Sequence, residues 1–306
     1  MISPKSRGLF DRVIVESGAY TLQPPTLAAA EGGGVVFAAA VGCAVNDLNC
    51  LRAAPVATVL AKQQPGLLGF LPNIDGVVLP LAFDAAFESG RFNRVPVMEG
   101  STHDEYRLFV PLVFDFANGA VTQELYPVAI SILLGIAPTS VPPIMAEYPL
   151  ANYPSADVAA ASVVTDAVFA CNRQNATDEL SRFVPTYVYE FNDPNAPQRH
   201  LPPATFPYGA AHESELQYLF DIVTTLPAIP LNADQEKLAN AMITYWSNFA
   251  YTGNPNAGPR GLSAPIWFRH NFIDYVHSLK PPQPQPSSSA AFSRDHHCKF
   301  WKGISK

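Results

Sequence analysis

Glu105 and His212 are the residues of this sequence whose types and positions could carry out chemistry. Glu105 follows residues 95–100, which read as a buried strand, and His212 lies in the loop after a second such run, residues 186–191. In a parallel α/β sheet, ligands bind beyond the C-terminal ends of the strands. A carboxylate that orients an imidazole and stabilises its charged form produces a general base. The two residues therefore indicate a hydrolytic site.

Taken alone, these residues leave simpler roles open. A single histidine in a loop is usually solvated or bonded to its neighbours, and Asp104-Glu105 is also typical of an acidic helix N-terminus. No spacing of Cys and His in the chain is typical of a zinc site. We therefore expect neither a metal nor a cofactor.

Short apolar runs predict the strands that would position these residues. Their content of β-branched and aromatic residues favours buried strands at residues 12–18, 95–100 and 186–191. Helical segments are predicted at residues 28–41, 56–63, 83–87 and, broken by prolines, within 111–170. An Asp-Gly turn predicts a hairpin within residues 70–80. The Pro- and Ser-rich residues 281–290 predict an exposed loop or linker.

The clearest helix is predicted at residues 233–251. Asn232 can cap its N-terminus, with Gln235 in the third helical position, and Gly253 can end it. Its apolar residues share one face: Leu238, Met242, Tyr245, Trp246 and Phe249. Short buried strands separated by helices favour an α/β sheet with helices on its faces.

Composition excludes several classes of partner. The chain has 306 residues, a net charge of -7 and no cluster of Lys and Arg, so neither a nucleic acid nor an anionic membrane surface is expected to bind it. No run approaches the ~20 apolar residues that a membrane-spanning helix requires. The first residues do not lead into the apolar region of a signal peptide. We expect any export signal to lie outside this chain.

The four cysteines allow three pairings. Polar turn-forming residues between Cys43 and Cys50 make a small closed loop possible, and Cys171 and Cys298 would then close a long one. The alternative is four free buried thiols, because cysteine is often simply a small hydrophobic residue. The residues alone do not decide between these alternatives.

Four blocks of sequence resemble the type-B carboxylesterase and cholinesterase family. Each resembles a defined part of that family: the segment after the nucleophile's helix, the block with the triad acid, the block with the triad histidine, and a late helix and turn. They are residues 3–10 with 15–18; residues 72–76 and 95–97, Gly100, residues 104–105 and Phe109; residues 209–216; and residues 246–250 with 252–256. The set spans nearly the whole chain. Residues 104–107 and 296–301 look most like the bacterial branch.

The resemblance assigns roles to particular residues. Glu105 resembles the triad acid and His212 the general base and acid of a Ser-Glu-His triad. Ser17 resembles a serine that hydrogen-bonds the acid, and Phe109 a residue that lines the substrate pocket. The family also pairs Cys43 with Cys50 and Cys171 with Cys298. Disulfides favour a secreted or extracytoplasmic location.

The sequence departs from the family at the nucleophile. The family's serine lies in a Gly-x-Ser-x-Gly elbow, which precedes the acid and helps build the oxyanion hole. No Gly-x-Ser-x-Gly occurs in the 306 residues. Residues 31–34 are glycine-rich but follow no predicted strand, and the neighbours of Ser17 do not form an elbow. We therefore expect a partial α/β-hydrolase fold, the C-terminal portion of one type-B domain over residues 1–306, without the N-terminal strands and the elbow.

The resemblance implies a serine-type carboxylic ester hydrolase whose partners are a small-molecule ester and the N-terminal part of the same fold. We expect the chain alone to be inactive. The alternative is a non-catalytic binding module or pseudoenzyme remnant, because the family includes adhesion proteins without the serine. The presence of both Glu105 and His212 argues against that alternative. An unrelated α/β protein is a third interpretation, which the four blocks disfavour.

Overall fold

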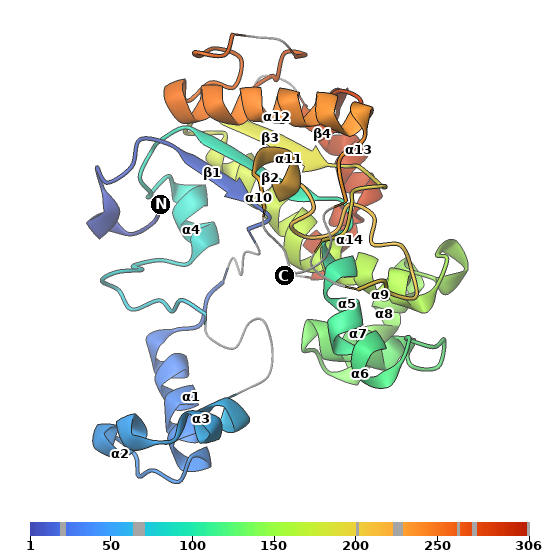
Figure 1. Cartoon of the computed structure of the whole chain (residues 1–306). Helices are drawn as coiled ribbons and strands as arrows, with labels where there is room; N and C mark the ends of the chain where they lie inside the picture. Colours follow the sequence, from blue (N-terminus) through green and yellow to red (C-terminus); the bar gives the residue numbers. More distant parts are fainter. Residues whose placement is uncertain are drawn as a thin grey trace. The chain divides into compact units, whose positions relative to one another are not determined.

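The computed structural model describes residues 1–18, 23–63, 71–199, 202–222, 229–261, 264–270 and 274–304. The chain divides into two compact units (Figure 1). The first contains Met1–Leu9 and Thr21–Asn93, and the second contains Phe10–Tyr20 and Arg94–Lys306. Each unit is described by itself below.

The second unit is built on a five-stranded sheet with the order β1-β2-β3-β4-β5. The strands are β1 (Val13–Glu16), β2 (Val97–Thr102), β3 (Thr186–Phe191), β4 (Val276–Leu279) and β5 (Gln285–Ser287). The first four are parallel, and β5 is antiparallel to β4. All residues of β2 and β3 are buried, as in parallel sheets covered on both faces. The three predicted strands and the α/β class are confirmed, and β4 and β5 were not predicted.

Helices cover the sheet on both faces (Figure 1). The longest, α12 (Ala233–Thr252), lies along one face, and α10 (Cys171–Leu180) lies against β2 and β3 on the other. Alternate residues of β3 point to opposite faces: Tyr187 and Tyr189 pack with α12, while Val188 belongs to the other apolar cluster. Helix α12 has the predicted capping box of Asn232 and Gln235, and Gly253 ends it with φ 76°. This predicted helix is confirmed.

Helices and helical turns fill most of the second unit between residues 105 and 180. They are η2 (Glu105–Leu108), α5 (Val110–Val113), α6 (Asp115–Asn118), α7 (Tyr126–Leu134), η3 (Pro138–Ser140), α8 (Val141–Glu147), η4 (Leu150–Asn152), α9 (Ala156–Val164) and the π-helix η5 (Thr165–Ala170). Several prolines of this region stand in first turns, where a missing N–H costs nothing. The prolines thus begin helices as well as interrupting them.

Three further helices complete the second unit: α11 (Leu216–Leu219), α13 (Ser289–Asp295) and α14 (Cys298–Ile304). The linker predicted at residues 281–290 is wrong in part. This segment contains β5, and Ser288 caps α13 by accepting a hydrogen bond from the Ala291 N–H at 3.0 Å. Gln285 and Pro286 are exposed, as predicted. Proline is compatible with β5 because β5 lies at the sheet edge.

The first unit is helical. It contains η1 (Pro4–Ser6), α1 (Leu27–Ala40), α2 (Leu48–Ala53), α3 (Val56–Lys62) and α4 (Phe83–Ser89), which confirms the three helices predicted there. The predicted hairpin is wrong over residues 71–80, and residue 70 lies outside the described residues. The Asp75 carboxylate accepts hydrogen bonds from the N–H groups of Val77, Val78 and Leu79. These donors are therefore not available to a strand pair.

Two disulfides join the four cysteines in the pairing that the family resemblance implied. The short disulfide links Cys43 and Cys50, and the long disulfide links Cys171 at the start of α10 to Cys298 at the start of α14. Within the described residues, no single helix has both the length and the apolar composition to cross a membrane. Tyr126–Leu134 and Pro138–Glu147 have this length and composition only when they are counted together, and the chain bends by 109° between them.

Candidate active site

The structure brings Glu105 and His212 together. Glu105 begins η2, which His103 and Asp104 separate from the end of β2, and His212 lies in the loop that follows β3. His212 Nδ1 lies 2.5 Å from Glu105 Oε2, and the backbone N–H of His212 donates to the Glu105 carbonyl at 3.2 Å. The Thr102 N–H donates to Glu105 Oε1 at 2.7 Å. Both oxygens of a fully buried carboxylate are therefore hydrogen-bonded, which fixes its orientation towards the imidazole.

The surroundings of His212 favour its charged form. Burial alone would lower the pKa of His212, but the hydrogen bond to Glu105 and the charges of Glu105 and Glu213 outweigh burial and raise it. His212 Nε2 makes no hydrogen bond to any residue that the structure describes. The ring thus has one nitrogen held by a carboxylate and the other open to accept a proton, which is the arrangement of a general base.

A further glutamate, Glu215, interacts electrostatically with Glu105 of this pair and with Glu16. Glu16, Gly100 and Tyr189 stand in one row across β1, β2 and β3. Burial, followed by the charges of Glu105 and Glu16, raises the pKa of Glu215 well above its usual value. This environment thus favours the neutral form of the Glu215 carboxyl group.

Two aromatic rings flank the His212 imidazole. The ring centroids of Phe109 and Phe169 lie 5.1 Å and 5.4 Å from that of His212. Phe109 was a predicted site residue, whereas neither Phe169 nor Glu215 was predicted. Phe169 belongs to the π-helix η5, whose Thr165 accepts a hydrogen bond from the Tyr106 N–H at 3.0 Å. Such π-helical turns frequently occur at functional sites, and this one packs against both loops of the pair.

Ser17 lies at the C-terminal end of β1 in a left-handed conformation, with φ 52°. Its N–H donates to the Gly100 carbonyl at 2.9 Å. Its hydroxyl is buried and has no hydrogen-bond partner among the described residues. The hydrogen bond that the resemblance implied between Ser17 and Glu105 is therefore not formed in this structure.

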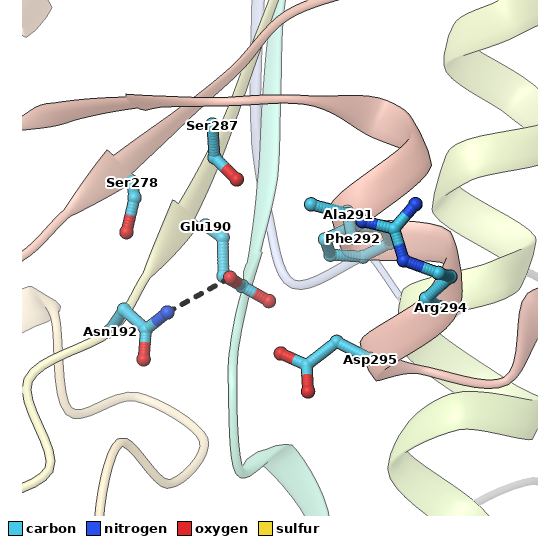
Figure 2. Close-up of a pocket in the computed structure, with 8 residues that line it drawn as sticks. All are labelled: Glu190, Asn192, Ser278, Ser287, Ala291, Phe292, Arg294 and Asp295. Atoms are coloured by element: carbon cyan, nitrogen blue, oxygen red, sulfur yellow. Dashed lines mark hydrogen bonds between the residues drawn. The ribbon is translucent and has the colours of Figure 1, made fainter.

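A second histidine is buried between carboxylates. His296 Nδ1 lies 2.6 Å from Asp166 and His296 Nε2 lies 2.7 Å from Glu190. Burial opposes the charge of His296, but these two carboxylates raise its pKa to about 9. Figure 2 shows Glu190 and Asp295 in one polar pocket. The Asn192 side-chain amide donates a hydrogen bond to Glu190 there.

A cluster of three residues that shares Asp295 with this pocket does not fit a metal ion. His103, Asp295 and His296 offer ligand atoms within 4.8 Å of one another. Both nitrogens of His296 are, however, bonded to carboxylates, and an imidazolium has no lone pair to give to a metal. The cluster is therefore a set of ion pairs.

The sequence pattern of the Carboxylesterase family matches residues 1–301. The chain belongs to the carboxylesterase family. It is 28% identical to human cocaine esterase over 99% of its length, and 28% identical to bovine carboxylesterase 4A over 99%. It is 25% identical to rat acylcarnitine hydrolase over 98%. These matches cover 54%, 58% and 54% of the relatives, so the chain spans about half the length of the curated relatives it matches.

Membership of the family agrees with the architecture. The parallel strands with helices on both faces form an α/β-hydrolase sheet. Glu105 and His212 both follow the C-terminal ends of strands, where ligands bind in such sheets. The family name supports carboxylic ester hydrolysis at the level of the family.

Proposed function

We propose that this chain supplies the acid and the base of a serine-type, type-B carboxylic ester hydrolase. The observation that carries the proposal is the hydrogen bond between Glu105 and His212, together with the unpaired Nε2 of His212. In this mechanism His212 takes the proton of a serine hydroxyl as the serine attacks the ester carbonyl. Glu105 stabilises the imidazolium that forms, and His212 then gives the proton to the leaving alkoxide.

The serine and the oxyanion donors come from outside these 306 residues in our proposal. The absence of a Gly-x-Ser-x-Gly elbow and the half-length coverage of the relatives support this. Three buried polar atoms near the pair also support it, because they have no hydrogen-bond partner among the described residues: Ser17 Oγ, Tyr189 OH and Glu215 Oε2. An unsatisfied buried group costs about 1–3 kcal/mol, so a further protein segment that pairs with them would be favoured.

The substrate in our proposal is a small-molecule carboxylic ester. Phe109 and Phe169 flank the imidazole, and their rings would contact an acyl or alcohol group placed next to His212 Nε2. Aromatic walls with a few polar groups are typical of small-molecule sites.

The test is to sequence the DNA that precedes the Met1 codon and to express the longer chain that it encodes. We expect an in-frame Gly-x-Ser-x-Gly, and hydrolysis of p-nitrophenyl acetate and butyrate by the longer chain. His212→Ala and replacement of the elbow serine by alanine should each abolish turnover, while the 306-residue chain should have none.

Two results would contradict the proposal. One is ester turnover by the 306-residue chain that survives His212→Ala. The other is a stop codon upstream together with a saturable binding partner and no turnover, which would favour a binding module.

A further inference from the structure

Asp104 connects the loop of Glu105 to the loop of His212. Its N–H donates to the Ala210 carbonyl at 2.9 Å, and its Oδ2 accepts from the Ala210 N–H at 3.0 Å. Two residues later, the His212 N–H donates to the Glu105 carbonyl. Consecutive residues of one loop thus bond alternate residues of the other, and Asp104 uses both its main chain and its side chain to do so.

Two cations hold the other oxygen of Asp104. Its Oδ1 lies 3.0 Å from His103 Nδ1 and 3.0 Å from Arg107 Nη2. Burial alone would raise the pKa of Asp104, but the hydrogen bond from His103 and the charges of His103 and Arg107 outweigh burial and lower it. Asp104 is therefore ionised, and its second oxygen is free to accept the Ala210 N–H.

The charged groups around His103 support its positive charge. Burial alone would lower the pKa of His103, but it is held well above its usual value by Asp104 in the same loop, Asp295 of α13 and Glu190 of β3. His103 Nε2 lies 3.3 Å from Asp295, and the rings of His103 and His296 lie 5.2 Å apart. Carboxylates thus face His103 from β3 and α13 as well as from its own loop.

Glycine at position 209 makes this contact possible. Gly209 has φ 63°, a left-handed conformation that side chains disfavour. A Cβ atom there would lie 2.3 Å from Asp104 Oδ2 and 2.9 Å from Arg107 Nη1. The close approach of the two loops therefore requires glycine at this position.

We infer that Asp104 is a positioning residue of the candidate site, which holds the 209–212 backbone so that His212 Nδ1 stays hydrogen-bonded to Glu105. The inference rests on the proposed function of Glu105 and His212 as acid and base. Asp104 acts through Ala210 and has no contact with the substrate in this role. Its measurable consequence is the raised pKa of His212, which depends on the distance to Glu105.

The test is Gly209→Ala, which pushes the two loops apart without changing any charge. The His212 ring is titrated by NMR in the ¹³C,¹⁵N-histidine-labelled chain, with His212→Gln to assign the signal. We expect the pKa of His212 to fall towards the ordinary histidine value. Gly135→Ala is the matched control, because Gly135 also has a left-handed φ of 64° but no atom within 4 Å of an added Cβ. It should leave the titration of His212 unchanged.

If Gly209→Ala does not fold, the same titration of His212 in Asp104→Asn tests the positioning role of Asp104. An asparagine must direct its NH₂ group either at the Ala210 N–H or at the cations His103 and Arg107, so one set of contacts is lost in either orientation. A fall in the pKa of His212 supports the inference. A folded Gly209→Ala or Asp104→Asn variant with an unchanged His212 titration overturns it.

The titration separates this inference from the proposed function. A pKa that falls in Gly209→Ala, in a longer chain without ester turnover, contradicts the proposed function alone. Turnover in the longer chain with an unchanged titration and an unchanged kcat in Gly209→Ala contradicts the positioning role alone.

Discussion

In Glu105→Gln, the proton of the neutral His212 ring should move from Nδ1 to Nε2. Glu105 uses one oxygen to accept from the Thr102 N–H and the other to accept from His212 Nδ1. Glutamine has one oxygen only. If its NH₂ group faced Thr102, a buried N–H would lose its acceptor at a cost of about 1–3 kcal/mol. The NH₂ group therefore faces His212, whose Nδ1 must become an acceptor and whose Nε2 must carry the proton.

The consequence for catalysis follows from the tautomer. With a proton on Nε2, His212 cannot accept the proton of a nucleophile there. Exchange of the triad acid for its amide costs about 10⁴-fold in kcat in a serine protease with the same arrangement. We expect a loss of that order for the nucleophile-bearing longer chain, with little change in KM.

The consequence for stability depends on pH in a defined direction. The folded pKa of His212 is raised, so its bond with Glu105 contributes stability that is fully present below the unfolded pKa of about 6.5. That stability is lost as the pH rises through the folded value. A hydrogen bond to a charged group contributes about 1.5–3 kcal/mol. Glu105→Gln should therefore lose more stability at pH 5.5 than at pH 9.

The assays are urea unfolding of the 306-residue chain at both pH values and ¹⁵N chemical shifts of the imidazole nitrogens. Glu236→Gln, at an exposed position in the first turn of α12, is the control that removes a carboxylate far from His212 in the sequence. An equal loss of stability at pH 5.5 and pH 9 would refute the reasoning. Unchanged nitrogen shifts for His212 would refute the tautomer argument.

Three further outcomes are expected. Cys171→Ser should destabilise the chain by about 5 kcal/mol and Cys43→Ser by about 2 kcal/mol, because the long and short disulfides close sequence separations of 127 and 7; thermal unfolding measures both. The charged form of His296, whose pKa is about 9, stabilises the fold below pH 6.5, and this contribution is lost as the pH rises through 9. The free energy of unfolding of the unchanged chain should therefore exceed that of His296→Gln by about 3 kcal/mol less at high pH than below pH 6.5. Urea unfolding at both pH values measures this change. Gly100→Ala would place a Cβ 2.3 Å from the Tyr189 ring and should cost about 1–3 kcal/mol or more, seen as a lower unfolding midpoint.

The strands that the sequence predicted each contain an uninterrupted run of apolar residues, such as residues 13–15 of β1 and residues 187–189 of β3. β4 was missed because His277 and Ser278 interrupt its apolar pattern. His277 is nevertheless fully buried, bonded to the hydroxyls of Tyr275 and Tyr245, and burial lowers its pKa to about 3. A polar residue whose hydrogen-bonding atoms are all paired is compatible with a core strand. The pairing with Tyr245, 32 residues away, is not contained in a local sequence pattern.

The prediction of a hairpin at residues 70–80 was wrong over residues 71–80 because the same residues allow a second hydrogen-bonding pattern. An Asp-Gly turn favours a hairpin, but a carboxylate can also bond the following N–H groups. Asp75 does the latter with three consecutive donors. Local residue types allowed both outcomes, so the sequence pattern did not decide between them.

The candidate site was predicted only as far as its residues occur in recognisable blocks. Glu105 and His212 lie 107 residues apart, and their residue types and predicted strand positions alone left simpler roles open. Phe169 lies in none of these blocks, and Glu215 lies in the block of His212 but was assigned no role, because each matters only through contacts across the fold. Ser17 shows the opposite case, in which the block was present and the implied hydrogen bond was not.

Some polar groups around the site have hydrogen-bond partners, and others have none among the described residues. Towards α13, Asp104, His103, Glu190 and His296 are all paired. Towards β1, which forms the edge of the described sheet, the hydroxyls of Ser17 and Tyr189 and one oxygen of Glu215 have no partner among the described residues. Three such groups cost together about 3–9 kcal/mol, which is comparable with the whole stability of an ordinary domain, about 5–15 kcal/mol. The three unpaired groups support the proposal that a further segment packs on the β1 side. A segment that pairs these groups would stabilise the second unit as well as supply its nucleophile.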